Sequence, residues 1–453
     1  MTFPKSHFLI SAPSSNSGKT TLTLGLLRAL KNRGLEVQPF KCGPDYIDTI
    51  HHTAAAGKQS INLDTFMSSE KHVKEIYSQY SSKADIAVTE GVMGLFDGAD
   101  KMKGSSAAIA ELLDISVILV VNAKSMAYSA APLLHGFKNF YKGIKVVGVI
   151  FNFVNTASHY SFLKDACTDV GIEALGYLPK NEDLVIPSRH LGLHISSETD
   201  YENIIEKIAK GIPKTIDIER LLEITSVPLP MSVSLSPTSV SSQTSYRHKL
   251  KITIAHDEAF SFIYHQNITV LSQFGEITYF SPIHDATLPE TDFLYLPGGY
   301  PELFSKELNE NISMRESIKS YCQNGGLTYA ECGGLMYIGN SITNSDGENF
   351  EMAGVLDCTT SMQNPKMTLG YRIANWGDLE IRGHEFHYSG LQNEALQTEP
   401  VTITNAKGIE TETKLYRKYN TFASYMHVYW GEKKEFIEKL LMATKAIRHE
   451  AKS

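Results

Sequence analysis

The sequence predicts an α/β protein made of two doubly wound domains. Short runs rich in β-branched and aromatic residues alternate with helical patterns along the chain, as a mostly parallel sheet covered by helices requires. Residues 226–246 interrupt this alternation, because they carry no charge and are rich in Ser, Pro and Thr. We therefore predict an N-terminal domain over residues 1–225, a linker over 226–247 and a C-terminal domain over 248–453.

The expected strands follow one another with helices between them. In the first half they are residues 7–11, 37–41, 85–90, 117–121 and 145–151, and a helix is expected over 20–33. In the second half they are residues 251–255, 276–280, 293–296 and 326–330. Residues 351–423 have a less regular and more β-like pattern.

Composition excludes some classes of function. The 453 residues are long enough for two cores, and the hydrophobic content of 42% with 20% charged residues is ordinary for a soluble protein. The net charge of -8 argues against nonspecific binding to nucleic acid, which needs basic surfaces. The start MTFPKSHFLI lacks the features of a signal peptide, and no apolar run reaches 18 residues. Five cysteines without a CxxC pair fit a reducing compartment, so we expect a cytoplasmic protein without a membrane partner.

A phosphate-binding loop follows the first expected strand. Residues 12–20 read APSSNSGKT, and the Gly-Lys-Thr ending opens the expected helix. Backbone N–H groups at such a helix start cradle phosphate, the Lys reaches the β- and γ-phosphates, and the Thr hydroxyl binds magnesium. Pro13 stands where the strict pattern has Gly, so the strand–loop–helix context carries this interpretation. The residues expected to bind ATP are Ser15, Asn16, Ser17, Gly18, Lys19, Thr20 and Thr21.

Two acidic, glycine-containing segments follow the next expected strands. FKCGPDYID covers residues 40–48, and TEGVMGLFDG covers residues 89–98. Ligands bind at this edge of doubly wound sheets, and carboxylates there hold Mg²⁺ or position a substrate. Asp45, Asp48 and Asp97 could instead cap turns and helices. The sequence leaves both interpretations open.

A cysteine nucleophile is predicted in the second half. Residues 326–335, GLTYAECGGL, read as a strand, a sharp turn carrying Cys332, and a helix. Such an elbow exposes the sulfur, and we expect the helix N-terminus to lower the thiol pKa. The flanking glycines favour this role for Cys332, whereas a buried structural role is preferred for the other cysteines: Cys42, Cys167, Cys322 and Cys358.

A base and an oxyanion hole are available for this thiol. His427 in SYMHVYW is the candidate base, and backbone N–H groups of Gly298, Gly299 and Gly333 could form the oxyanion hole. His384 and His387 in RGHEFHYS might suggest a metal site, but no HExxH pattern or thiolate partner accompanies them, which disfavours zinc.

With these motifs the chain resembles the cobyrinate a,c-diamide synthase family over nearly its full length. The matching segments are FKCGPDYID, EGVMGLFDG, LPGGYPE, YAECGGLMY and RGHEFHYS, in the family's order. The resemblance implies a P-loop, dethiobiotin-synthetase-like ATPase domain joined to a class I glutamine amidotransferase domain. It also implies a C–N-forming ligase that uses ATP, Mg²⁺ and L-glutamine to amidate the a- and c-acetate groups of a corrinoid, cobyrinate, through an acyl phosphate. A homodimer is one assembly to consider.

The resemblance also implies roles for individual residues. Lys19 and Thr20 would bind ATP and Mg²⁺, with Glu90 and Asp45 as further metal ligands. The region where ATP meets the substrate carboxylate would be lined by Lys41, Asp45, Tyr46, Asp48 and Asp97.

One departure concerns the catalytic triad of class I amidotransferases, which has Glu two residues after the His. Tyr429 occupies that position here, so we predict a dyad of Cys332 and His427 and leave open what orients His427.

Three alternatives stay open. The same reaction could act on hydrogenobyrinate or nickel-sirohydrochlorin. The N-terminal domain also resembles partitioning-type ATPases, although the C-terminal domain speaks against that function. A binding module with an inactive glutaminase is disfavoured, because Cys332 and His427 are both present.

Overall fold

The computed structural model describes residues 5–179, 198–227, 249–393 and 396–450. The chain divides into two compact units, Met1–Ser239 and Val240–Ser453. Most of the predicted linker lies outside the described residues. Its first two residues belong with the N-terminal unit, since Ser226 pairs with Ser6 and Val227 N donates to Lys5 O at 2.9 Å. Among the described residues, no helix is long and apolar enough to cross a membrane.

The N-terminal unit contains a parallel sheet. Seven of its described strands run in the order β3-β2-β4-β1-β5-β6-β7. The five strands expected from the sequence are present, and β3 and β7 were not predicted. The strands are β1 (Ser6–Ser11), β2 (Val37–Cys42), β3 (Ile61–Leu63), β4 (Ile86–Glu90), β5 (Ser116–Asn122), β6 (Val146–Val154) and β7 (Glu173–Pro179).

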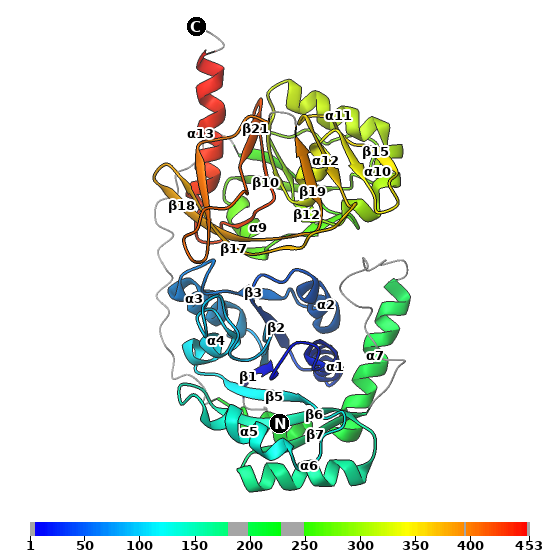
Figure 1. Ribbon diagram of the computed structural model, residues 1–453, viewed down its shortest axis with the longest axis vertical. Coiled ribbons are helices and arrows are strands. Elements are labelled where there is room, and N and C mark those ends of the chain that lie inside the picture. Colours follow the sequence, from blue (N-terminus) through cyan, green and yellow to red (C-terminus); the bar gives the residue numbers. More distant parts are fainter. Residues whose placement is uncertain (1–4, 180–197, 228–248, 394–395, 451–453) are drawn as a thin grey trace. The chain divides into compact units, whose positions relative to one another are not determined.

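Helices cover both faces of this sheet (Figure 1). Alternate residues of each strand point to opposite faces, so that Leu9 joins one hydrophobic cluster and its neighbours Phe8 and Ile10 join the other. The Leu9 cluster contains residues of α3–α6, and the opposite cluster contains residues of α1, α2, α7 and α8. This is the predicted doubly wound arrangement. The helices are α1 (Lys19–Asn32), α2 (Ile47–Ala56), α3 (Glu70–Ser81), α4 (Ser106–Leu113), α5 (Ala130–Asn139), α6 (Ala157–Val170), α7 (Glu198–Thr215) and α8 (Ile218–Ile224).

The C-terminal unit has a main sheet in the order β10-β8-β11-β13-β22-β21. Its pairings are parallel except for β21 with β22, and the four strands expected from the sequence all belong to it. The strands are β8 (Leu250–Ala255), β10 (Gly275–Phe280), β11 (Phe293–Leu296), β13 (Leu327–Glu331), β21 (Tyr416–Lys418) and β22 (Thr421–Ser424). The helices of this unit are α9 (His265–Leu271), α10 (Ser305–Glu310), α11 (Ile312–Gln323), α12 (Gly333–Ile338) and α13 (Glu435–Glu450).

Smaller sheets account for the β-like pattern of residues 351–423. One has the order β20-β17-β18-β23 and is antiparallel, another has the order β15-β14-β16-β19, and β12 pairs with β9. Their strands are β9 (Phe260–Phe262), β12 (Gly298–Gly299), β14 (Ser341–Thr343), β15 (Asn349–Glu351), β16 (Cys358–Ser361), β17 (Thr368–Trp376), β18 (Leu379–His387), β19 (Gly390–Asn393), β20 (Val401–Asn405) and β23 (His427–Tyr429).

The order of the main sheet brings three loops together. β13 lies between β11 and β22 and is parallel to both, so the segments that follow these strands leave the same edge of the sheet. Those segments carry Gly298, Cys332 and His427. Residues separated by about 130 positions in the sequence therefore meet at one edge.

Candidate active sites

The predicted phosphate loop lies between β1 and α1, in the strand–loop–helix context that the sequence indicated. Gly18 caps α1 with φ 94°, and Asn16 has φ 59°, so two residues adopt the left-handed region that turns the loop into the helix. Asn152 at the end of β6 donates to Ser17 O at 3.0 Å. A Cβ on Gly18 would lie 1.9 Å from Asn152 Nδ2, so glycine is needed for this contact. The sequence analysis did not single out Asn152.

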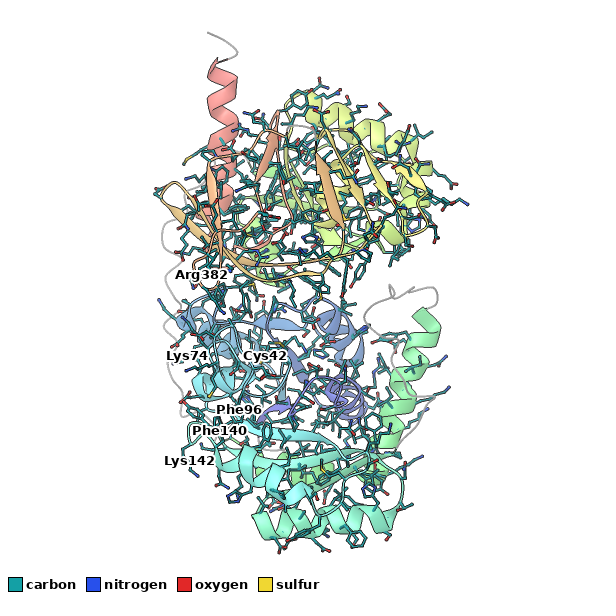
Figure 2. The ribbon with its side chains drawn as sticks, in the orientation of Figure 1. Cys42, Lys74, Phe96, Phe140, Lys142 and Arg382 are labelled. Carbon is teal, nitrogen blue, oxygen red and sulfur yellow. The ribbon has the colours of Figure 1, made fainter. Side chains whose placement is uncertain are left out.

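The loop 91–98 forms a wall beside the phosphate loop. Lys19 Nζ donates to Met93 O at 2.6 Å, and Leu95 N donates to Ala12 O at 2.8 Å. Phe96 holds this loop in place, because its ring centroid lies 5.6 Å from that of Phe137. It lies 5.1 Å from the ring centroid of Phe140 (Figure 2). The Lys19 ammonium is therefore held at the loop by backbone oxygens.

A buried network of charges lies at the carboxyl ends of β2 and β4. Lys41 Nζ lies 2.5 Å from Asp48 Oδ2 and 3.0 Å from Glu90 Oε1, and His52 Nε2 lies 2.8 Å from Glu90 Oε2. None of these four side chains is more than 1% exposed. Burial alone would raise the pKa of Glu90, but Lys41 and His52 outweigh it and hold that pKa well below its usual range. Glu90 is therefore an anion.

Thr20 connects this network to the phosphate loop. Its Oγ1 donates to Glu90 Oε1 at 2.9 Å, which places a hydroxyl and a carboxylate together at the start of α1. Both are hard oxygen donors of the kind that Mg²⁺ prefers, and Mg²⁺ usually completes its shell with water and substrate phosphates. The pair fits such an ion. Among the described residues, no group of three His, Cys, Asp or Glu side chains could hold a metal.

The remaining predicted residues of this half lie nearby in capping roles. Asp45 Oδ1 accepts from Asp48 N at 2.9 Å at the start of α2, and Tyr46 is the cap residue of that helix and is buried. Asp97 Oδ2 accepts from Gly94 N at 3.0 Å within its own loop. The sequence left open whether these aspartates cap turns and helices. The contacts of Asp45 and Asp97 are of this capping kind. The sequence analysis also missed His52, whose partner Glu90 is 38 positions away.

Cys332 occupies the sharp turn between β13 and α12. Its φ of 46° and ψ of -103° are strained for a residue with a side chain, and such strain costs about 1–3 kcal/mol. Cys332 N donates to Ser424 O at 2.8 Å, which ties the turn to β22. The geometry is that of the predicted nucleophile elbow.

The expected lowering of the Cys332 pKa is wrong. Burial, followed by the nearby carboxyl groups of Glu302 and Glu385, raises the pKa of the thiol, and the Gly333 N–H only partly opposes them. The thiol contacts Phe386 O at 3.8 Å. Cys332 is therefore protonated at rest, and its activation depends on a base.

The predicted oxyanion glycines surround the elbow. A Cβ on Gly333 would lie 2.9 Å from Gly299 N, so the two backbones are in close contact. A Cβ on Gly298 would lie 2.2 Å from His427 Cε1, so the imidazole ring rests directly on the Gly298 backbone. The structure thus brings these glycines together with Cys332 and His427.

His427 is a neutral base in this environment. It is 1% exposed, and burial holds the pKa of its imidazole well below the usual value. His384 and His387 lower this pKa further, and the carboxylate of Glu385 only partly opposes them. Its strand is fixed at the next residue: Val428 N donates to Glu331 Oε1 at 2.9 Å, and Asn267 Nδ2 donates to Val428 O at 2.8 Å.

Glu331 is a second functional candidate that the sequence analysis missed. It precedes Cys332, is 1% exposed, and accepts from Tyr295 Oη at 2.8 Å in addition to Val428 N. Burial raises the pKa of this carboxyl to about 8, because amide and hydroxyl donors stabilise the anion less than a cation would. One buried side chain therefore links the nucleophile strand to the strand of the base.

His384 and His387 have different partners. His384 Nδ1 lies 3.1 Å from Tyr264 Oη, whereas His387 Nε2 lies 2.9 Å from Glu385 Oε1. Glu385 also accepts from Arg372 Nε at 2.6 Å. Both histidines belong to β18, beside the strand of His427.

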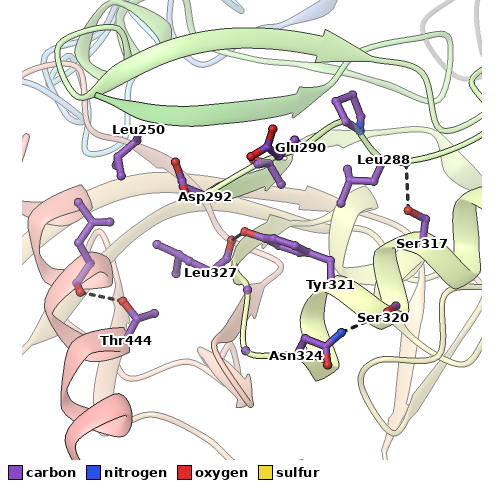
Figure 3. A pocket seen from close by; sticks show the side chains of 15 residues that line it. Leu250, Leu288, Glu290, Asp292, Ser317, Ser320, Tyr321, Asn324, Leu327 and Thr444 are labelled. Atoms are coloured by element: carbon purple, nitrogen blue, oxygen red, sulfur yellow. Dashed lines mark hydrogen bonds between the residues drawn. The ribbon is translucent and has the colours of Figure 1, made fainter. Parts of the chain in front are cut away.

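A pocket of about 620 Å³ lies away from this chemistry (Figure 3). Its lining includes Leu250, Asp292 and Leu327, at the amino ends of β8, β11 and β13. Cys332 follows the opposite end of β13. The pocket therefore lies at the wrong edge of the sheet to hold the substrate of Cys332.

The fold and the two sites define a class: a two-domain glutamine amidotransferase with a nucleotide-binding domain. Residues 8–193 match the family described as the CobQ/CobB/MinD/ParA nucleotide binding domain, and residues 251–435 match the CobB/CobQ-like glutamine amidotransferase domain. The chain belongs to the cobyrinate a,c-diamide synthase family, as its full-length relatives show.

Relatives from several organisms bear the name cobyrinate a,c-diamide synthase, and three of them illustrate the similarity. The protein from Listeria innocua is 40% identical over 96% of this chain and 99% of its own length. The one from Picrophilus torridus is 39% identical over 96% and 97%, and the one from Priestia megaterium is 36% identical over 98% of both. A solved structure of a glutamine amidotransferase covers 43% of this chain with 13% identity and a TM-score of 0.30, which is too low to support an argument.

Replacing Lys19 tests the phosphate loop. We expect Lys19→Met to weaken ATP binding by about 10–100-fold, because a hydrogen bond to a charged group contributes about 1.5–3 kcal/mol. Isothermal titration calorimetry with ATP measures this change. Lys58→Met is the control, because Lys58 instead pairs with Glu36, which precedes β2. Equal ATP affinity of the two variants would contradict the assignment.

Replacing Glu331 tests its raised pKa. A carboxyl whose pKa rises from 4.5 unfolded to about 8 folded adds stability below pH 4.5 and loses it as the pH rises toward 8. Relative to Glu331→Gln, the wild type should therefore lose about 1.4 kcal/mol of unfolding free energy per pH unit in this window. Denaturant titrations at pH 5, 6, 7 and 8 measure the difference, with the exposed Glu290→Gln as control. A pH-independent difference would show that Glu331 ionises normally.

Proposed function

We propose that this protein amidates the a- and c-acetate carboxylates of cobyrinate, using ATP and ammonia released from L-glutamine. Membership of the cobyrinate a,c-diamide synthase family supports this function. The observation that carries it is the strained elbow of Cys332, with the Gly298 backbone and His427 beside it, on a chain that also has an intact phosphate loop.

In the amidotransferase half, Cys332 attacks the side-chain amide of glutamine. His427 takes the thiol proton as the C–S bond forms and gives it to the departing ammonia. N–H groups of Gly299 and Gly333 are proposed to stabilise the oxyanion of the tetrahedral intermediate. Water then hydrolyses the glutamyl thioester and releases glutamate. Because the resting thiol has a raised pKa and the imidazole a lowered one, proton transfer is unfavourable until the attack begins.

In the nucleotide half, a substrate carboxylate is too poor an electrophile to react with ammonia directly. Transfer of the γ-phosphoryl group of ATP to the carboxylate gives an acyl phosphate, and ammonia displaces phosphate to leave the amide. Lys19 and the N–H groups of residues 15–21 would bind the phosphates. Asp45, Tyr46, Asp48 and Asp97 remain proposed neighbours of the acyl phosphate. Lys41 already pairs with Asp48 and Glu90, so we propose that it sets the charge of this region.

We also propose Mg²⁺ as the metal cofactor. Thr20 and Glu90 would hold it, with Asp45 as a further ligand, and the ion would offset charge on the phosphates. Its proposed place is supported by the 2.9 Å approach of Thr20 Oγ1 to Glu90 Oε1. The consumption of ATP and the unpaired thiols of all five cysteines support work in the cytoplasm.

Replacing Cys332 tests the division of labour. Cys332→Ser should abolish glutamine-driven amidation and leave amidation with free ammonia within about twofold, because the acyl phosphate forms without the thiol. Cys358→Ser is a matched control, since Cys358 is also buried but lies in β16. Loss of both activities in a folded Cys332→Ser protein would contradict the proposed role.

Product analysis tests the substrate. Incubation with ATP, Mg²⁺ and glutamine should add two amides to cobyrinate, which mass spectrometry detects as two successive conversions of a carboxyl to a carboxamide. Hydrogenobyrinate and nickel-sirohydrochlorin are the comparison substrates. Diamidation of either one in preference to cobyrinate would replace the proposed substrate but keep the reaction.

A further inference from the structure

The base His427 has no glutamate at the position that orients it in the usual triad. Tyr429 stands there, and its ring packs edge-on against Tyr264 at 5.3 Å. In a triad the carboxylate fixes the imidazole and stabilises the imidazolium that forms when the base takes a proton. Another group must meet these two needs.

Two nearby carboxyl groups have hydrogen-bond partners other than His427, although the negative charge of Glu385 partly opposes the lowering of the His427 pKa by burial. Glu331 accepts from Val428 N and Tyr295 Oη. Glu385 accepts from Arg372, His387 and Thr413, and although burial opposes its ionisation, these partners hold its pKa below the usual value. Glu385 and His384 are successive residues of β18, so their side chains point to opposite faces of the sheet.

His384 lies directly against the base. It is the cross-strand partner of His427 in the antiparallel pair β18–β23, and such partners share one face of the sheet. The two rings are stacked, with centroids 5.1 Å apart and planes inclined by 22°. This is the offset arrangement that aromatic rings prefer.

His384 is itself held in place and uncharged. Tyr264 Oη lies 3.1 Å from its Nδ1, and the two residues are 2% and 5% exposed. Burial, with the positive charge of Arg372, lowers the pKa of His384 to about 3. An uncharged ring does not compete with His427 for the proton that leaves the thiol, so it can hold the base in place while that proton moves.

We propose that His384, held by Tyr264, is the positioning residue of His427 and replaces the triad glutamate by stacking. Its ring fixes the plane of the base during attack by Cys332. This inference rests on the proposed glutaminase activity, in which His427 is the base.

Two substitutions separate the ring from its hydrogen bond. His384→Asn keeps a polar atom near the place of Nδ1 but removes the ring, whereas His384→Phe keeps a ring and removes the polar atom. We expect His384→Asn to lower kcat of glutamine hydrolysis by about 10²-fold, as misplacement of a catalytic group does, with KM for glutamine unchanged. His384→Phe should restore kcat to within about tenfold of wild type, and ammonia-driven amidation should stay unchanged in both. The control is His284→Asn, an exposed histidine of the same unit.

The outcomes are distinct. A wild-type kcat in His384→Asn, equal losses in the two variants, or a parallel loss of ammonia-driven amidation would each overturn the positioning role. If His384→Asn does not fold, His384→Leu decides, because it removes the ring but keeps an apolar side chain at this buried position: a lower kcat at constant KM supports the role, and an unchanged kcat overturns it. A wild-type protein without glutaminase activity would instead overturn the proposed function itself.

Discussion

The parallel pairing of β13 with β11 on one side and β22 on the other is the constraint on which the amidotransferase site depends. The register places Ala330 opposite Leu296 and Glu331 opposite Ser424, so the three strands end at the same level. The bond from Cys332 N to Ser424 O carries this pairing into the strained turn. The strained backbone of Cys332 persists because the hydrogen bonds of β13 to β11 and to β22 fix the position of the turn.

Glu90 and Glu331 each end a strand beside one of the two sites. Burial acts on both carboxyl groups, but their neighbours differ. Glu90 and Glu331 are equally inaccessible, at 0% and 1% exposure. Lys41 and His52 supply positive charge to Glu90 and keep it ionised, whereas Glu331 faces an amide and a hydroxyl, and its pKa rises to about 8. Glu90 can therefore bind a cation at the phosphate loop, whereas Glu331 is mostly neutral and links two strands by hydrogen bonds.

Periodicity and turn chemistry were enough to predict the strands before the phosphate loop, Gly298 and Cys332, because each is a strongly apolar run that ends in a turn. They did not predict β22 and β23, the short strands on either side of the turn before His427. What the sequence analysis missed depends on distant contacts. His52 and Asn152 carry no motif, and their roles arise only when folding places them beside Glu90 and Ser17. The pKa of Cys332 was predicted in the wrong direction for the same reason: the helix start was visible in the sequence, but the burial and the carboxyl groups around the thiol were not.

The irregular phosphate loop shows how a motif can depart from its pattern without losing its geometry. The strict pattern has Gly at the position of Pro13, where the chain needs room. Here the glycine stands in the opposite loop. A Cβ on Gly94 would lie 2.8 Å from Pro13 O and 2.6 Å from Asp97 Oδ2, so a larger residue at this position would clash with the phosphate loop. Gly94 N donates to Asp97 Oδ2 within its own loop, and Leu95 N donates to Ala12 O, which fixes that loop against the first. Gly94 thus allows the two loops to approach closely, although the phosphate loop has Pro13 in place of the usual Gly. The two segments therefore form one structural unit.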